Sequence, residues 1–268
     1  MPEQRRQIGR FATSLRRAAH APRLRPALAA CGLVLVALGA PGPAAAQGSG
    51  FLFRAPAASL SIRGGFDRAV AGSDIFSFTT DELTLDRGDF SSPTLALDFS
   101  LAIRPSLDLV IGTSFSNATA HSESRDFVGE DDLPIEQTTK FQRVPVTVGL
   151  RAFLSPRGRS IGRFAWVPSR VAPYVGAGGG VMLHRFRQTG EFVEAETRDI
   201  FFDEYTSTGW SPTAHALAGV ELSLSPRLAL TGEGRYTWSN ADMGRDFDRF
   251  DRIDLSGLAA TAGIAVRF

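Results

Sequence analysis

Residues 257–268 read Gly-Leu-Ala-Ala-Thr-Ala-Gly-Ile-Ala-Val-Arg-Phe. Leucine, isoleucine, valine and phenylalanine occupy only even-numbered positions of this stretch, and glycine, threonine and arginine only odd-numbered ones. Side chains of a β-strand point alternately to its two faces, so the pattern predicts a strand with one apolar face. Helical spacing would instead scatter these apolar residues around a cylinder, and a helix is therefore excluded here.

The same alternation recurs from about residue 57 onward. In the segment 94–103 one face is formed by Leu95, Leu97, Phe99, Leu101 and Ile103. Most of these segments have the length that a tilted barrel strand needs to cross a bilayer, about 9–11 residues. The predicted strands are 57–70, 94–103, 107–116, 138–153, 174–187, 213–224, 228–239 and 254–268.

The connectors between these strands alternate in length. Two of them, Arg104-Pro105-Ser106 and Ser225-Pro226-Arg227, are tight turns. Short periplasmic turns and long external loops are typical of outer-membrane barrels. We therefore expect an all-β fold, an eight-stranded antiparallel up-and-down transmembrane β-barrel with both termini on the periplasmic side. The long connectors are 71–93, 117–137, 188–212 and 240–253, and a fifth, 154–173, is long although it falls on the periplasmic side.

The first 46 residues have the pattern of an export signal. Seven arginines precede a short apolar run from Ala27 to Ala40, and Ala44-Ala45-Ala46 follows it. Small residues at this place predict cleavage between Ala46 and Gln47. Residues 28–31 match a lipobox, but most of the apolar run follows Cys31, which disfavours lipidation. We expect a signal peptide at 1–46, a short extension at 47–56 and a barrel at 57–268, located in a bacterial outer membrane.

Charge supports this organisation. The chain carries +1, the signal contributes seven arginines and one glutamate, and the mature chain is therefore +1 − 6 = −5. This acidic balance argues against nucleic acid as a partner. The outer connectors 71–93, 117–137 and 188–212 are acidic, whereas 154–173 contains four arginines and no acid. The two sides of the predicted barrel thus differ in charge.

Two motifs resemble those of a known family. The final strand, with Ile264, Val266 and Phe268, resembles the signal that the barrel-assembly machinery reads. The segment 172–180, Ala-Pro-Tyr-Val-Gly-Ala-Gly-Gly-Gly, resembles a strand start of OmpW-like proteins. The mature chain as a whole resembles the small outer-membrane β-barrel superfamily, which includes OmpA transmembrane domains, OmpX and OmpW. This resemblance implies a monomer whose partners are outer-membrane lipid, lipopolysaccharide and, during biogenesis, the assembly machinery.

Strict alternation places eight charged side chains in the lumen. An eight-stranded barrel is just wide enough for side chains to fill it, and a buried charge must be paired. The four positive and four negative charges therefore predict a plug of ion pairs, with a gated narrow polar path as the open alternative. A bulge at Pro145, or at the glycines of 64–65 and 178–180, would reverse part of this facing. The eight residues are Arg63, Asp98, Asp108, Arg143, Arg151, Glu221, Glu233 and Arg235.

Aromatic residues fall into two groups. Those near the strand ends are expected to form interfacial girdles, namely Phe66, Phe115, Phe141, Phe153, Tyr174, Tyr236, Trp238 and Phe268. Those of the outer connectors are Phe76, Phe78, Phe90, Phe192, Phe201, Phe202, Tyr205 and Trp210. Three interpretations of the outer connectors stay open: a protruding sheet that contacts partners, a carboxylate site for divalent cations centred on residues 130–132, or loops whose aromatics pack on one another.

Catalysis finds little support. The mature chain has three histidines, His121, His184 and His215, and none has a nucleophile and an acid at a spacing that a triad needs. No connector has the ligand order of an EF-hand. We expect no catalytic residue, cofactor or metal, and a non-enzymatic barrel with a role in envelope integrity or surface interaction. A narrow porin for small solutes is the first alternative, and a barrel enzyme that modifies lipid A is the second.

Overall fold

The computed structural model describes residues 50–129, 132–194 and 197–268. The expected signal peptide and its cleavage site between Ala46 and Gln47 lie outside these ranges, as do Glu130 and Asp131 of the acidic group 130–132.

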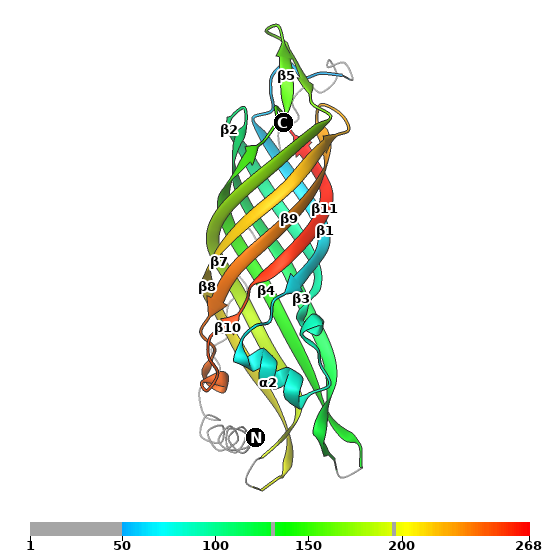
Figure 1. Ribbon diagram of the computed structural model, residues 1–268, viewed down its shortest axis with the longest axis vertical. Coiled ribbons are helices and arrows are strands. Elements are labelled where there is room, and N and C mark those ends of the chain that lie inside the picture. Colours follow the sequence, from blue (N-terminus) through cyan, green and yellow to red (C-terminus); the bar gives the residue numbers. More distant parts are fainter. Residues whose placement is uncertain (1–49, 130–131, 195–196) are drawn as a thin grey trace.

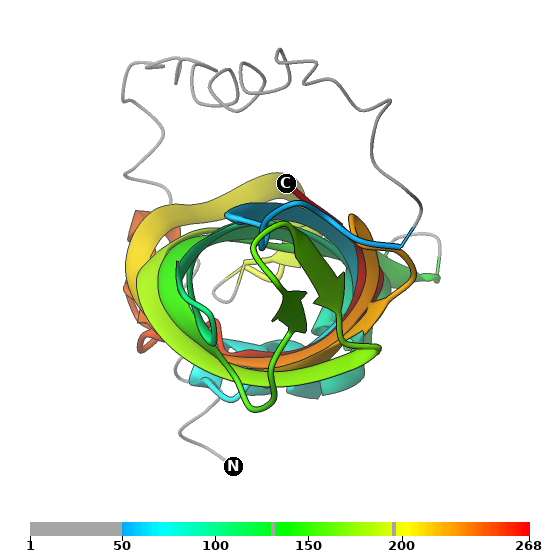
Figure 2. The ribbon, with the colours of Figure 1, turned by 90° about the horizontal axis from the view of Figure 1, so that it is seen from above.

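The described residues form a closed sheet of eight long antiparallel strands (Figures 1 and 2). Each strand pairs with the next along the chain, and β11 pairs with β1 to close the ring. This closure confirms the predicted fold class. The strands are β1 (Ala58–Ala69), β2 (Ser92–Arg104), β3 (Leu107–Val128), β4 (Pro134–Phe153), β7 (Val171–Val193), β8 (Ile200–Ser223), β9 (Leu228–Ala241) and β11 (Gly257–Arg267).

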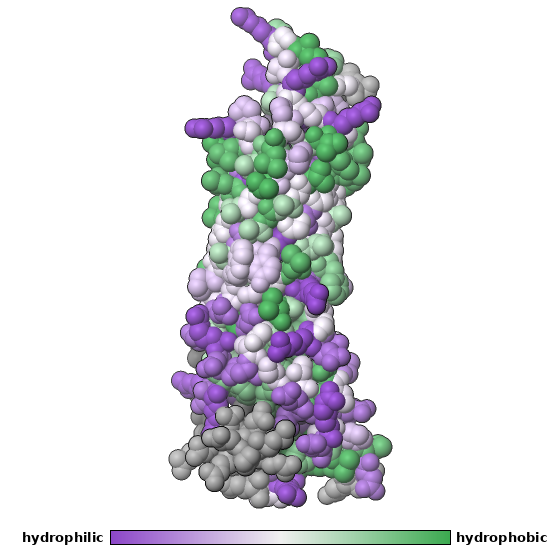
Figure 3. Space-filling model, viewed as in Figure 1, coloured by the Kyte–Doolittle hydropathy of each residue, from purple (hydrophilic) through white to green (hydrophobic). Residues whose placement is uncertain are grey.

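A belt of exposed apolar side chains surrounds the half of the barrel that contains the short turns, and Figure 3 shows it as a green band. It includes Ile62, Leu95, Ile111, Val148, Val175, Leu222 and Ile264. Soluble proteins rarely expose so large an apolar surface, and a closed barrel leaves no unpaired strand edge for lipid to meet. The molecule is a transmembrane β-barrel of the small outer-membrane type, located in a bacterial outer membrane, as the sequence predicts.

Four strands continue well beyond this belt. β3 runs to Val128 and β4 begins at Pro134, while β7 reaches Val193 and β8 begins at Ile200. Residues 117–137 and 188–212 were expected to be connectors, and they instead form two long hairpins that protrude from the outer end (Figure 1). The prediction was wrong on these strand lengths because the apolar alternation ends at the membrane surface, whereas the backbone hydrogen bonds continue.

The other two outer connectors fold over the outer end of the barrel. Residues 71–93 contain α2 (Asp74–Glu82) and η2 (Arg87–Phe90), and residues 240–253 contain η3 (Arg245–Phe247). A short strand, β10 (Ile253–Asp254), pairs with the end of β9. None of the helices in the described ranges is long and apolar enough to cross a membrane.

The basic connector 154–173 forms a small hairpin at the periplasmic end. Its strands are β5 (Gly158–Ile161) and β6 (Ala165–Pro168), and Figure 2 shows it across the opening of the ring. The hairpin is joined to the start of the described chain, because Leu52 and Trp166 exchange two backbone hydrogen bonds of 2.9 and 2.7 Å.

Candidate functional site

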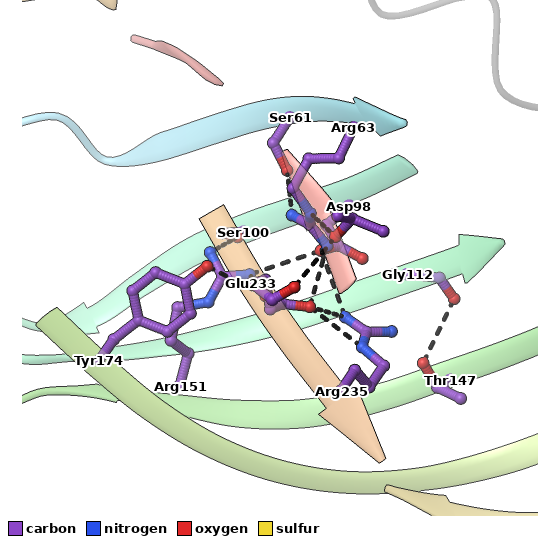
Figure 4. A network of polar contacts seen from close by, with 11 residues as sticks. Ser61, Arg63, Asp98, Ser100, Gly112, Thr147, Arg151, Tyr174, Glu233 and Arg235 are labelled. Carbon is purple, nitrogen blue, oxygen red and sulfur yellow. Dashed lines mark hydrogen bonds and ion pairs between the residues drawn. The ribbon is translucent and has the colours of Figure 1, made fainter. Parts of the chain in front are cut away.

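The centre of the lumen holds a compact ion cluster (Figure 4). Arg63 of β1 is 1% exposed, and its Nη2 lies 2.5 Å from Asp98 Oδ2 of β2 and 3.0 Å from Glu233 Oε1 of β9. Its Nη1 also donates to the Ser61 hydroxyl over 3.0 Å. Because β9 is separated from β1 by β11 in the sheet, these contacts join different walls of the barrel.

Two more arginines complete the cluster. The Arg235 guanidinium lies 2.9 Å from Glu233 and 3.4 Å from Asp98. The Arg151 guanidinium lies 3.4 Å from both carboxylates and stacks over the Tyr174 ring, 4.5 Å from its centroid. The Tyr174 hydroxyl donates to Glu233 Oε2 over 3.1 Å. The cluster thus draws on β1, β2, β4, β7 and β9 and reaches across the lumen.

The arrangement satisfies the requirement that buried ions be paired. Two carboxylates are surrounded by three guanidinium groups, so the centre carries one excess positive charge. Breaking one buried ion pair leaves an uncompensated charge, which is strongly destabilising. The position of the Asp98 carboxylate also requires a glycine at residue 112. A Cβ on Gly112 would collide with Asp98 Oδ1.

A second group of ion pairs lies at the periplasmic end of the lumen. Arg157, from the connector just before β5, places its Nη1 2.9 Å from Asp108 Oδ2 of β3. Arg267 of β11 places its Nη2 2.8 Å from Glu221 Oε2 of β8. The basic connector therefore supplies one partner to the lumen, in addition to the exposed arginines on its hairpin.

Arg143 forms a third polar level toward the outer end. Its Nη2 lies 2.9 Å from Asp67 Oδ2, and its Nη1 donates to the carbonyl oxygens of Leu255 and Ser256 over 3.0 and 3.2 Å. The guanidinium also lies 5.1 Å from the centre of the Phe141 ring. This residue thus stands between the polar lumen and an apolar region above it.

The structure places all eight predicted lumen charges inside the barrel, but it distributes them over three levels. Arg63, Asp98, Arg151, Glu233 and Arg235 meet at the centre, and the other three pair with residues that the sequence prediction omitted. Two of these partners, Asp67 and Arg267, are in the inward phase of their strands, so the alternation contained the signal. Arg157 lies in a connector outside any predicted strand, so the alternation of side chains could not indicate that it reaches the lumen.

The alternation of inward and outward side chains continues without a break at the positions where a bulge would have reversed it. The pairing of β4 with β7 keeps one register through Pro145 and the glycines of 178–180, and β1 does so through Gly64 and Gly65. The prediction of girdle aromatics was partly wrong. Phe141, Phe153 and Tyr174 are buried in the lumen, whereas Phe66, Phe115, Trp238 and Phe268 are exposed on the outer surface.

Above the polar levels, apolar side chains of α2 pack against the inner wall at the outer end of the barrel. Ile75 and Phe76 are fully buried, and the Phe76 ring lies 5.3 Å from Phe141 of β4 and 5.8 Å from Phe186 of β7. Phe90 of η2 packs on Phe76 at 4.7 Å. We call the buried apolar group formed by α2, η2, η3 and the strands around them the outer cap.

Polar contacts hold α2 in this position. The backbone N–H of Gly72 donates to Asp254 Oδ2 over 3.0 Å, and that of Asp254 donates to the Ser73 hydroxyl over 3.1 Å. The backbone N–H of Asp251 donates to Asp74 Oδ2 over 2.9 Å. These hydrogen bonds join the segments before α2 and after η3.

The aromatics of the outer connectors divide between the cap and the surface. Phe76, Phe90 and Tyr205 are buried, whereas Phe202 is 73% exposed and Trp210 is 62% exposed. The Tyr205 ring packs against Phe192 at 4.6 Å, and burial, with Asp203 and Asp246 nearby, raises the pKa of its hydroxyl. The protruding strands and the mutually packed aromatics are both present, whereas contact of these strands with a partner stays a prediction.

The histidines do not form a catalytic arrangement within the described ranges. His121 is exposed, and its Nδ1 lies 3.0 Å from the Thr138 hydroxyl. His184 and His215 are buried, and within the described part of the chain no hydrogen bond reaches either ring nitrogen of His184 or Nδ1 of His215. No group of three or more potential metal ligands gathers among the residues that the structure describes.

The expected assembly signal lies at the periplasmic end of β11. The side chains of Ile264, Val266 and Phe268 all face outward from the barrel and are exposed. The Phe268 backbone donates to the Ala58 carbonyl over 3.0 Å, and its ring lies 6.4 Å from that of Phe99. Recognition of these residues by the assembly machinery stays a prediction.

Comparisons with known proteins give distant similarities only. No protein-family model matches the sequence, and no curated protein matches it either. Among solved structures, Neisserial surface protein A is 13% identical over 79% of this chain and 96% of its own, with a TM-score of 0.41. OprG from Pseudomonas aeruginosa is 15% identical over 81% and 99%, also at 0.41. A major outer membrane protein from Thermus thermophilus is 13% identical over 79% and 100%, again at 0.41.

Proposed function

We propose that the protein is a non-enzymatic, non-conducting barrel that contributes to envelope integrity and presents its outer hairpins for surface interaction. The central ion cluster carries this proposal. Its side chains come from five strands and meet within hydrogen-bonding distance at one level of the lumen. An ion that passed this level would have to separate buried ion pairs, at a cost of several kcal/mol.

The outer cap supports the same function independently. Phe76 packs at once on Phe141 and Phe186, which come from neighbouring strands of the barrel wall. The apolar rings around Phe76 offer no replacement for the water shell of an ion. The polar cluster and the apolar cap are thus two different barriers in series.

Conductance in planar bilayers tests the closed lumen. We expect the wild-type protein to stay at baseline, and Arg235→Ala to stay there as well, because the outer cap is intact. Replacing residues 74–82 by a glycine-serine linker should also leave baseline current, since the central cluster still blocks the path. Only the combination of both changes is expected to open a pore.

The matched control is Arg185→Ala, which removes an arginine from the outer surface and should leave the current at baseline in either background. Heat-modifiable gel mobility checks that every variant is folded. Regular openings of the wild-type protein, or of the Arg235→Ala variant, would contradict a lumen closed at two levels.

A second experiment tests whether the protein has enzymatic activity toward lipid A, the lipid that some small barrel enzymes modify. Lipid A from cells with and without the protein is compared by mass spectrometry. We expect identical masses. A new acyl chain, or the loss of one, that depends on the protein and disappears in a His184→Ala variant would contradict the proposal.

A further inference from the structure

The small hairpin at the periplasmic end has one covered edge and one free edge. Trp166 of β6 exchanges two backbone hydrogen bonds with Leu52, so the edge of β6 that faces away from β5 is paired. On the other side of the hairpin, β5 pairs with no strand except β6 within the described ranges. An unpaired strand edge presents a row of N–H and C=O groups with which another chain can pair.

The register of the hairpin defines which backbone groups β5 presents. Antiparallel strands alternate between residue pairs that exchange hydrogen bonds and pairs that do not. Because Trp166 directs its N–H and C=O away from β5, its pairing with Ser160 is of the second kind. Ser160 therefore directs its N–H and C=O to the free edge, and Gly158, two residues earlier, does the same. The hydrogen bond of 2.8 Å from the Ser169 N–H to the Arg157 carbonyl agrees with this alternation.

The periplasmic surface of the protein is cationic. In the described segments at this end only Asp108 and Glu221 are acidic, and both are buried in ion pairs. Six arginines of the same segments are exposed. A surface of one charge sign favours partners of the opposite sign. The segments are 50–57, 102–108, 153–173 and 221–229, and the exposed arginines are Arg54, Arg104, Arg159, Arg163, Arg170 and Arg227.

The two faces of β5 differ in what they offer a neighbouring strand. On one face a Cβ at Gly158 would collide with the Trp166 ring, so this part of the face is covered. The opposite face presents Arg159 and Ile161, both of which are exposed. The turn that follows adds Phe164, which is 72% exposed. A strand added to β5 would thus place its side chains beside a cation and beside apolar groups.

Space for a ligand adjoins the start of β5. A cavity of about 570 Å³ lies between the hairpin and the rim of the barrel. Its lining includes Gly158 of β5, Trp166 of β6 and Arg104 of the turn between β2 and β3, and no acidic side chain of the described residues lines it. Ligand pockets of proteins measure about 300–1,000 Å³. The cavity can therefore take up one end of a chain that is bound along β5.

We propose that the free edge of β5 binds an extended acidic segment of a periplasmic polypeptide, which adds to the hairpin as a further strand. The backbone groups of Gly158 and Ser160 hold the backbone of the segment, and Arg159 and Arg163 pair with its carboxylates. Lipid is a poor ligand for this edge, because the hairpin lies across the opening of the ring (Figure 2). The inference goes beyond the proposed function, since this edge and the outer hairpins lie at opposite ends of the barrel.

Amide NMR of the folded, isotope-labelled barrel in detergent micelles tests the proposal. The probe is the acidic peptide Glu-Val-Glu-Val-Glu, capped at both ends. The amides of Gly158 and Ser160 should shift and should exchange more slowly with solvent, because they acquire acceptors. The amides of Arg159 and Ile161 already pair with β6 and should change little. The basic peptide Lys-Val-Lys-Val-Lys should leave all four unchanged.

Two pairs of variants separate the backbone from the charge. Ser160→Pro removes the N–H at the free edge, a place where strands tolerate proline, and should bind the acidic peptide at least about tenfold more weakly. Its matched control, Ser160→Ala, keeps this N–H and should bind as the wild type does. Arg159→Gln with Arg163→Gln should weaken binding about tenfold. The control for charge is Arg185→Gln with Arg249→Gln, which removes two exposed arginines at the outer end and should change nothing.

A modified peptide distinguishes strand addition from simple attraction of charges and does not depend on the folding of a variant. N-methylation of its valines keeps the charge but blocks pairing along the edge, so this peptide should bind far more weakly. Equal binding of the methylated or the basic peptide would overturn the proposal, as would unchanged affinity in Ser160→Pro or an equal loss in Ser160→Ala. Displacement of the acidic peptide by equal concentrations of phosphatidylglycerol or of soluble peptidoglycan fragments would overturn it as well.

Discussion

The membrane-embedded half of this barrel and the half that protrudes from the membrane have opposite patterns of polarity. The single strand β4 passes through both halves and shows both patterns. In the membrane-embedded half, Val146 faces outward and Arg151 faces the lumen. In the protruding half, Lys140 faces outward and Phe141 faces the lumen. The strand keeps a single register with β7 through both halves. Only the chemistry of its two faces is exchanged.

The cause of this exchange is the solvent outside each half. Lipid favours apolar side chains on the outer wall, so the narrow lumen receives the polar residues and must pair their charges. Water favours polar side chains on the outer wall, so the lumen can fill with an apolar core like that of a soluble domain. The exchange on β4 occurs between Gln142 and Val144 and marks the outer membrane surface.

The largest effect is expected from breaking the polar half. Asp98→Asn leaves three guanidinium groups around Glu233 alone, and we expect a loss of about 3–5 kcal/mol in the free energy of unfolding. Urea unfolding in lipid vesicles measures it. The control Asp242→Asn removes an exposed surface pair with Arg252 and should change nothing measurable. A loss of similar size in both variants would refute the assigned importance of the buried cluster.

The next effect concerns the apolar half. Phe76→Ala removes a fully buried ring from the outer cap, and we expect a loss of about 3 kcal/mol, at the lower end for such a change because the cap lies at the rim. Amide hydrogen exchange of residues 74–82 should accelerate, while exchange within the membrane-embedded strands stays the same. Phe202→Ala, on an exposed ring, is the control. Equal exchange in both variants would contradict a packed cap.

These two halves also explain what the sequence could predict. The strand 94–103 lies within the membrane, where apolar residues point outward, and its facing and its Asp98 were predicted as found. Phe141 was assigned to a girdle because it lies near the end of its predicted strand, but it shares the inward phase of Arg143. Above the membrane surface the polarity of the two faces is reversed, and the lumen receives apolar side chains. The same reversal hid the outer parts of β3 and β8.

Contacts between distant segments were beyond the reach of a strand pattern. The helix α2 packs on walls that follow it by more than 50 residues, and its polar and apolar residues lack a simple alternation. Arg157 meets Asp108 from a connector of irregular structure. The charges of the connectors were visible in the sequence, but their partners depend on the closed barrel.

A smaller loss in the free energy of unfolding is expected where the backbone of Gly112 touches the Asp98 carboxylate. Gly112→Ala places a methyl group against Asp98 Oδ1, which three arginines hold in place, and we expect a loss of about 1–3 kcal/mol from overpacking. Urea unfolding measures the change. The control Gly64→Ala meets no neighbouring atom within 4 Å. Equal stability of the two variants would show that the carboxylate can move without cost.

The smallest expected changes in stability come from Thr→Val substitutions, and they should differ in sign between the two halves. The buried hydroxyl of Thr139, in the outer half, has no hydrogen-bond partner among the described residues, whereas that of Thr147 donates to the Gly112 carbonyl over 3.4 Å in the polar half. We expect Thr139→Val to stabilise the protein by about 1 kcal/mol or less, and Thr147→Val to destabilise it by about 1 kcal/mol. Thermal midpoints in detergent compare them, and changes of the same sign would count against two different interiors.

The position of the membrane surface on β4 tests the central claim most directly. Single cysteines at Thr138, Lys140, Gln142, Val144 and Val146, in a background without Cys31, are labelled with a fluorophore in bilayers that contain brominated lipid. Quenching should be strong at 144 and 146 and weak at 138 and 140, with the change at 142. Uniform quenching along the strand, or a change displaced well into either half, would contradict a barrel whose polarity is exchanged at the membrane surface.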